Sequence, residues 1–186
     1  MSVRISQLSP SRKIKMNPMR EIRIEKVTLN IGAGKDQSKL DKAVLLLKSI
    51  CGRSPVKTIT SKRIQEWGLR PGLPIGCKLT LRKNEARQML MRLLEAKDRR
   101  LNETQFDDEG NISFGIGEYI DVPGVKYDPG IGIMGFQVCI TLERPGFRIK
   151  RRDLLRKKIS QRHKIKRDEA VNFMKKNFDV RVGDAE

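Results

Sequence analysis

The hydrophobic pattern of this chain first predicts strands that bury one face. Apolar and polar residues alternate along residues 75–82 and 135–144, which is the period of two that a half-buried strand produces. A third alternating stretch, residues 21–32, changes parity in its middle, which predicts a β-bulge near Glu25 and Lys26. Shorter extended segments are expected at residues 55–60 and 111–119.

Two further stretches follow helical spacing. Apolar residues recur every three or four positions between residues 38 and 52, where we expect Ser38 to cap the helix and Gly52 to end it. A second amphipathic helix is expected over residues 84–97, capped by Asn84. Both helices have a single apolar stripe, so each is expected to pack on a sheet through one side.

The order of elements is β-α-β-β-α-loop-β, which predicts an α+β fold with a mixed or antiparallel sheet. Two main helices can cover only one face of that sheet, so we expect the other face to be solvated or bound. We expect residues 17–147 to form the α+β domain, after a basic tail at residues 1–16. A basic C-terminal extension follows at residues 148–186 and includes a short helix at residues 168–178.

The charge of the chain narrows its partners. Lysine and arginine number 40 against 22 aspartates and glutamates, a formal net charge of +18. A chain this basic repels itself unless a polyanion neutralises it, which indicates nucleic acid, with an anionic membrane surface or a heparin-like polymer as rarer alternatives. No apolar run approaches the roughly 18 residues of a membrane-spanning helix, and the first residues contain no apolar signal core. We expect a cytoplasmic protein with no membrane partner.

Residues that could support catalysis are few. The three cysteines are too far apart in sequence for a disulfide framework or a zinc ribbon. His163 lies in a basic run with no acid to orient it, and residues 32–35 lack the spacing of a phosphate-binding loop. The acids at residues 107–109 are typical of a solvated turn. We therefore expect no metal, no cofactor and no enzymatic activity, with a basic RNA-modifying or RNA-processing enzyme as the alternative.

The outward positions of the predicted strands carry cations, hydroxyls and amides but no aromatic ring. Sheets that bind single-stranded RNA stack bases on aromatic rings, whereas this set suits phosphates, 2′-hydroxyls and minor-groove edges. We expect folded or helical RNA on this face. A DNA-compacting protein is a third interpretation, although the basic segments lack evident apolar wedges. The outward residues are Lys26, Thr28, Asn30, Lys78, Thr80, Arg82, Gln137 and Thr141.

Five separated segments, in this order, resemble one known family: VTLNIGAG, PVKTITSKRI, GLRPGLPIGCKLTLR, FGIGEYIDVPGVKYDPGIGIMGF and ERPG. They are similar to the universal family of large-subunit ribosomal proteins that binds 5S rRNA, in its archaeal and eukaryotic branch. The resemblance spans about residues 17–180 and implies an α+β fold in the central protuberance of the ribosome. It implies contacts with 5S rRNA, 23S-type rRNA and the elbow of the P-site tRNA. It also implies a neighbouring 5S-binding ribosomal protein and a small-subunit head protein across the intersubunit bridge.

The resemblance also assigns residues. It carries over Asn30, Thr58 and Thr80 as 5S rRNA contacts, and the outward pattern adds Lys57. Family members often have glutamine where this chain has Arg53, for which we expect a phosphate contact instead. The loop expected to reach tRNA contributes Lys62, Arg63, Trp67, Gly68, Leu69 and Arg70, although Trp67 has the alternative of folding onto the core. The extension is expected to wind along rRNA through Arg148, Lys150, Arg151, Arg152, Arg156, Lys157, Lys158, Arg162, His163, Lys164, Lys166 and Arg167.

Overall fold

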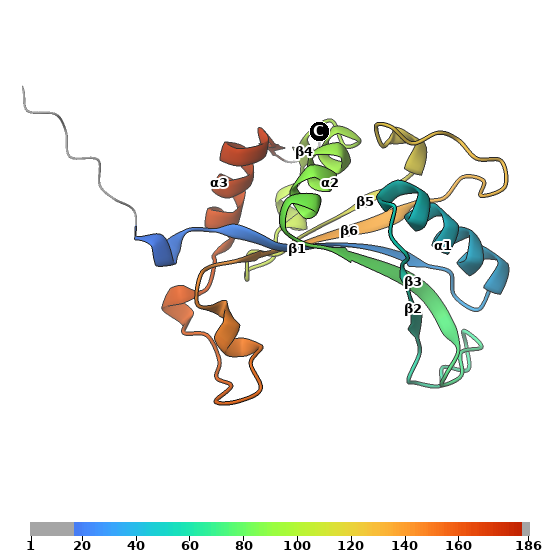
Figure 1. Ribbon diagram of the computed structural model, residues 1–186, viewed down its shortest axis with the longest axis horizontal. Coiled ribbons are helices and arrows are strands. Elements are labelled where there is room, and N and C mark those ends of the chain that lie inside the picture. Colours follow the sequence, from blue (N-terminus) through green and yellow to red (C-terminus); the bar gives the residue numbers. More distant parts are fainter. Residues whose placement is uncertain (1–16, 184–186) are drawn as a thin grey trace, which may run out of the picture.

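A computed structural model describes residues 17–183, which form an antiparallel sheet with helices on one side (Figure 1). The sheet has five strands in the order β2-β3-β1-β6-β5, and each neighbouring pair is antiparallel. This is the α+β class that the sequence predicts. The strands are β1 (Arg23–Gly32), β2 (Val56–Ile59), β3 (Pro74–Leu81), β5 (Ile112–Ile116) and β6 (Phe136–Glu143). The predicted tail at residues 1–16 lies outside the described residues.

Three helices lie on the same side of the sheet (Figure 1). They are α1 (Gln37–Cys51), α2 (Lys83–Glu95) and α3 (Arg167–Phe178). Near the end of the described chain, β7 (Arg181–Val182) pairs in parallel with β4 (Arg100–Leu101) and so fixes this end to the domain. Single 3-10 turns complete the fold: η1 (Pro18–Arg20), η2 (Glu103–Gln105), η3 (Tyr119–Asp121), η4 (Phe147–Lys150) and η5 (Gln161–His163).

The core lies between the sheet and the helix layer. Leu29 of β1, Leu47 of α1 and Leu90 of α2 are fully buried, as the alternating and helical patterns predict. Burial of one such side chain stabilises a fold by about 1.5–3 kcal/mol. The extension contributes to the same core through Ile165 and Met174, which have exposures of 1% and 0%. These contacts fix the C-terminal extension against the sheet.

The predicted bulge in β1 is confirmed, because the register between β1 and β6 shifts between Ile24 and Lys26. Both predicted N-caps are wrong. The carboxylate of Asp36 caps α1 by accepting hydrogen bonds from the backbone N–H groups of Ser38 and Lys39 at 3.0 and 3.3 Å. A hydrogen bond from the Ser38 hydroxyl is the largest reason that the pKa of Asp36 is lowered. At the second helix, α2 begins before Asn84 and has no side-chain cap.

The C-terminal stop of α1 is confirmed. Gly52 adopts a left-handed conformation with φ of 67°, and its N–H donates to the Lys48 carbonyl. A residue without Cβ adopts this conformation at little cost, which is why glycine commonly follows the last turn of a helix. None of the helices in residues 17–183 is both long enough and apolar enough to span a membrane.

Candidate nucleic-acid interface

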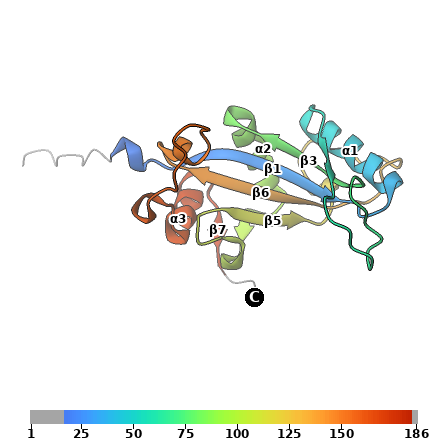
Figure 2. The same cartoon turned by 90° about the horizontal axis from the view of Figure 1, so that it is seen from below.

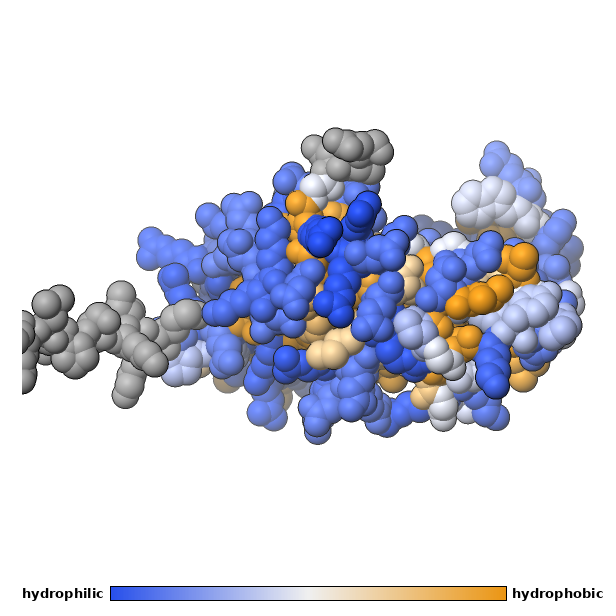
Figure 3. All heavy atoms as spheres, turned by 90° about the horizontal axis from the view of Figure 1, so that it is seen from above, coloured by the Kyte–Doolittle hydropathy of each residue, from blue (hydrophilic) through white to orange (hydrophobic). Residues whose placement is uncertain are grey.

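The face of the sheet opposite the helices carries no helix and is bordered by two projecting segments (Figures 1 and 2). One is the loop between β2 and β3, and the other is the first part of the extension, which follows β6. We call this surface the open face. Seen from the other side, the molecule shows hydrophilic residues over the helices and hydrophobic residues mainly toward α1 (Figure 3).

Pairing between strands brings the predicted outward residues together on the open face. Asn30 lies opposite Lys78 on one side and Gln137 on the other, and its Nδ2 donates to Gln137 Oε1 at 3.4 Å. Thr28 lies opposite Thr80 in the next row. Residues that face each other across an antiparallel pair share one side of the sheet, so their outward placement is confirmed. Their contact with RNA stays a prediction.

Thr58 also belongs to the open face because it pairs with Gly76 of β3. A Cβ at Gly76 would lie 2.6 Å from the Ile31 carbonyl oxygen and 3.0 Å from Thr58 Oγ1. Only glycine therefore allows the Thr58 hydroxyl and β1 to approach β3 this closely. This close approach holds the half-buried Thr58 hydroxyl in a fixed position on the open face.

The placement of Lys57 on the outward face is wrong. Lys57 pairs with the buried Cys77, so its side chain projects toward the helix side, where Nζ lies 3.0 Å from Asp41 of α1. Arg53 is turned to the same layer and lies 2.6 Å from Glu85 of α2. This geometry does not favour the predicted contacts of Lys57 and Arg53 with an RNA on the open face.

Two carboxylates at one end of the open face are neutralised within the protein. Arg23 Nε lies 3.1 Å from Glu143 Oε1, and Arg151 Nη2 lies 2.9 Å from Glu143 Oε2. Arg151 also pairs with the buried Glu25 beside the β1 bulge. The sequence predicts Arg151 as an rRNA contact, whereas the structure shows it as the counterion of two acids.

Replacing Arg151 by alanine is expected to weaken rRNA binding by roughly five- to tenfold, because the buried Glu25 would lose its counterion and Glu143 would keep only Arg23, so this end of the open face would repel phosphates. Filter binding at fixed salt measures the effect. Arg87→Ala is the matched control, since it removes an exposed arginine of α2, on the helix side, that makes no ion pair within residues 17–183. Adding Glu143→Gln to Arg151→Ala should restore part of the affinity. Equal losses for the two single arginine variants would contradict this role.

The loop after β2 has its own tight tip. The backbone N–H groups of Ile64 and Leu69 donate to each other's carbonyls at 3.1 and 2.9 Å. Trp67 in the turn is 65% exposed, so it does not fold onto the core. Leu69 is 6% exposed, so its side chain is not available as the predicted tRNA contact. The remaining predicted residues of the loop are exposed: Lys62, Arg63, Gly68 and Arg70.

Several predicted residues of the extension make contacts within the protein. Lys164 pairs with Glu109 at 2.6 Å, and Arg167 lies 3.7 Å from Glu103. The ring of His163 packs edge-on against Phe147, and its Nε2 is 2.9 Å from the Pro145 carbonyl oxygen. The predicted residues with exposed side chains that pair with no carboxylate in residues 17–183 are Arg148, Lys150, Arg152, Arg156, Lys157, Lys158, Arg162 and Lys166.

The sequence patterns assigned no role to Arg144, which is 3% exposed. Its guanidinium donates to the carbonyls of His163 and Lys164 at 3.3 and 3.2 Å and to Glu169 of α3 at 2.7 Å. Burial acts to raise the pKa of Glu169, but the Lys166 N–H and Arg144 together lower it. Arg144 therefore joins the end of β6 to the extension. The only sequence signal was its place in the quoted ERPG segment.

The three cysteines of the described residues differ in burial and position. Burial raises the pKa of the Cys51 and Cys77 thiols to about 11, so both stay protonated at neutral pH. Cys139 is exposed on the open face. No group of three or more metal-ligating side chains converges within residues 17–183.

Comparisons with known proteins converge on one family. Residues 17–70 match the family model described as ribosomal protein L5, and residues 74–173 match the model for the C-terminus of the same ribosomal family. The chain is 47% identical over 167 residues to the large ribosomal subunit protein uL5 of Nanoarchaeum equitans, covering 89% of this chain and 98% of that one. The same protein of Sulfurisphaera tokodaii is 47% identical over 168 residues, covering 90% and 95%. That of Methanobrevibacter smithii is 44% identical over 165 residues, covering 89% and 97%.

Proposed function

Since the chain belongs to the ribosomal protein L5 family, we propose that it is a non-enzymatic constituent of the large ribosomal subunit that binds folded 5S rRNA on its open face. It works in the cytoplasm, within the ribosome. The observation that carries the 5S rRNA assignment is the open face itself. Its rows of hydroxyls, amides and cations come from three strands in register, with no aromatic ring among them.

The chemistry of the open face determines how the RNA is held. Lys78 and Arg82 supply exposed cations for phosphates, while Asn30, Thr28 and Thr80 are half-buried and fixed by the sheet. Fixed donors and acceptors of this kind discriminate between groups on a folded RNA, because they lose little side-chain entropy on binding. Long cations alone supply affinity without a preference for shape.

The experiment that tests this assignment is binding of 5S rRNA at moderate salt with excess tRNA and unrelated duplex RNA as competitors. Retained tight binding is expected, because the fixed polar groups recognise a particular folded surface. Loss of 5S rRNA to either competitor would mean that the net charge of +18 dominates and would remove the 5S assignment. The slope of the logarithm of the binding constant against the logarithm of salt concentration gives the number of neutralised phosphates, because each contributes about −0.7 to −0.9.

We propose the other partners from the resemblance to the family. The extension contacts 23S-type rRNA, and the chain lies in the central protuberance, beside a second 5S-binding ribosomal protein. A head protein of the small subunit lies across the intersubunit bridge. The loop after β2 reaches the elbow of the P-site tRNA, with exposed Trp67 at its tip and arginines on either side. The two backbone hydrogen bonds at the tip of the loop favour this assignment, because a stiff loop loses little conformational entropy when it contacts tRNA.

Replacing Arg63 and Arg70 by alanine is expected to weaken tRNA binding to the P site of reconstituted subunits by about three- to tenfold, because each arginine supplies an exposed phosphate contact. Affinity for 5S rRNA should change by less than twofold, since neither residue lies on the open face. Lys39→Ala combined with Lys42→Ala removes the same charge from exposed positions of α1 and is the control. An equal tRNA effect in the control pair would remove the loop from the tRNA site.

A further inference from the structure

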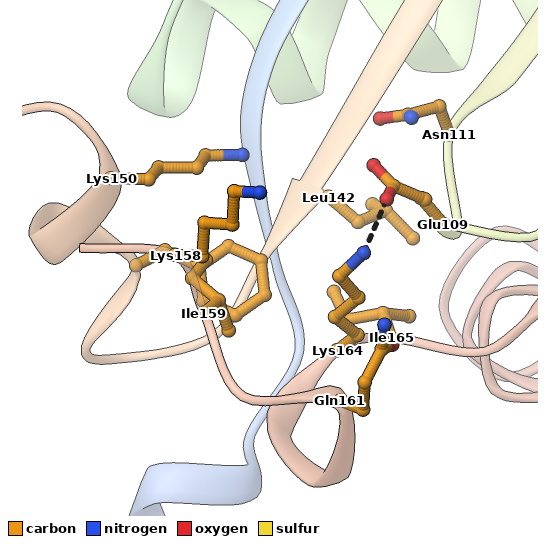
Figure 4. Close-up of a pocket in the computed structure, with 10 residues that line it drawn as sticks. Glu109, Asn111, Leu142, Lys150, Lys158, Ile159, Gln161, Lys164 and Ile165 are labelled. Carbon is orange, nitrogen blue, oxygen red and sulfur yellow. Dashed lines mark hydrogen bonds and ion pairs between the residues drawn. The ribbon is translucent and has the colours of Figure 1, made fainter.

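A pocket of about 280 Å³ lies between the turn before β5 and the extension (Figure 4). We call it the extension pocket. Its apolar part is formed by Leu142 at the end of β6, Phe147 of η4, and Ile159 and Ile165 of the extension. The volume is slightly below the roughly 300 Å³ at which pockets for small molecules begin. The space therefore suits one flat group about the size of a nucleobase.

The charged residues of the extension pocket are divided between two sides. Glu109 and Lys164 form an ion pair at 2.6 Å on one side, so their charges offset each other. The ammonium ends of Lys150 and Lys158 lie together on the other side (Figure 4). Neither pairs with a carboxylate within residues 17–183. Two adjacent cations without an acid repel each other, and a bound phosphate would relieve that repulsion.

Groups suited to a nucleobase line the rest of the pocket. Asn111 and Gln161 bring side-chain amides to the side opposite the lysine pair (Figure 4). An amide both donates and accepts hydrogen bonds, as base edges do. The ring of Phe147 contributes to the floor, with Lys150 Nζ 5.2 Å from its centroid. A planar base can pack on such a floor, while a bare phosphate would leave the apolar part empty.

We propose that the extension pocket receives one unstacked nucleotide of large-subunit rRNA, with its base on the apolar floor and its phosphate between Lys150 and Lys158. This inference rests on the proposed function and deepens it by giving the extension a defined site in place of diffuse charge contacts. Single-stranded segments of RNA are recognised in this way, through a base taken out of the stack and held on its edges and faces.

Three variants of the full chain test the proposal by binding to large-subunit rRNA at fixed salt. Ile159→Trp fills the pocket without changing charge and is expected to weaken binding by tenfold or more, about the effect of losing one stacked base. Lys150→Ala with Lys158→Ala removes the phosphate contacts and should lose at least as much. Lys175→Ala with Lys176→Ala removes the same charge from exposed positions of α3, in the same extension but outside the pocket, and should lose no more than threefold.

Binding of 5S rRNA by the same variants distinguishes a failure of the pocket proposal from a failure of the proposed function. The wild-type chain should bind both RNAs, and its failure would remove the proposed function itself. If wild type and Ile159→Trp bind large-subunit rRNA equally well, the pocket proposal fails although the proposed function stands. Equal losses for the two double variants would also overturn it, since charge alone would then explain the contact. Melting curves establish that Ile159→Trp folds, and the lysine pair tests the site without filling the pocket.

A second measurement identifies the source of the nucleotide. Methyl resonances of Ile159 and Ile165 are followed while AMP, UMP, ribose 5-phosphate or an acidic peptide is added to the whole protein. Weak millimolar binding of AMP or UMP, stronger than that of ribose 5-phosphate, is expected for one nucleotide taken out of a longer RNA. Micromolar binding of a free mononucleotide, or tighter binding of the peptide, would overturn the assignment to rRNA.

Discussion

Thr80→Glu is expected to weaken 5S rRNA binding by about 100-fold while the free protein stays folded. Thr80 is half-buried in the middle of the open face, opposite Thr28 and between the cations Lys78 and Arg82. A carboxylate there would repel phosphates. It would also pair with Lys78 and Arg82, so these cations would attract phosphates less strongly. Like charges at an interface cost several kcal/mol, and about 1.4 kcal/mol corresponds to each factor of ten.

Direct titration of labelled 5S rRNA measures the effect, with a melting curve to verify folding. Thr104→Glu is the matched control, because it makes the same chemical change at an exposed position of η2, outside the sheet. That control should lose no more than twofold. Thr80→Ser keeps a hydroxyl and should stay within threefold of wild type. If Thr80→Glu binds as tightly as wild type, the open face is not the 5S rRNA site.

The sequence predicted the open face correctly because a half-buried strand has a period of two. Once Val27, Leu29 and Ile31 are assigned to the core, Thr28 and Asn30 must lie on the other side. The same rule failed for Lys57 because β2 is a four-residue edge strand with no clear apolar side. In that strand Val56, which is 64% exposed, shares a face with Lys78. Polarity alone does not give the register of such a strand.

Other contacts were not visible in the sequence because a residue's environment there comes from distant segments. Leu69 was assigned to tRNA by its neighbours in the loop, yet the tip turns its side chain inward. Arg151 belongs to a dense basic run, and its partners Glu25 and Glu143 become visible only when the extension folds back on β1 and β6. Tertiary pairing of this kind has no local signal. For the same reason a buried role for Arg144 could not be deduced from its basic surroundings.

Arg144→Met is expected to lower the free energy of unfolding by about 2–4 kcal/mol. Methionine keeps much of the buried volume but removes the donor to two backbone carbonyls and to one carboxylate oxygen of Glu169. Loss of one partner of a fully buried ion pair costs about 3–5 kcal/mol. The expected value is somewhat smaller here because the Glu169 side chain is 38% exposed and can turn to water. Denaturant titration measures the change, and Arg148→Met, at an exposed arginine of η4, is the control.

The free energy of unfolding at acid pH distinguishes a role of the Arg144–Glu169 ion pair from a role of packing alone. The pKa of Glu169 in the folded chain is lowered below its ordinary 4.5. Its contribution is therefore complete above that ordinary pKa and is lost as pH falls through the lower folded-state pKa. Wild type should lose this part of its stability in acid, while Arg144→Met, which lacks the arginine, should show a shallower decrease. Parallel profiles in the two proteins would mean that Arg144 stabilises the extension only by filling space. A steeper decrease in the wild type would identify it as the charged link between β6 and α3.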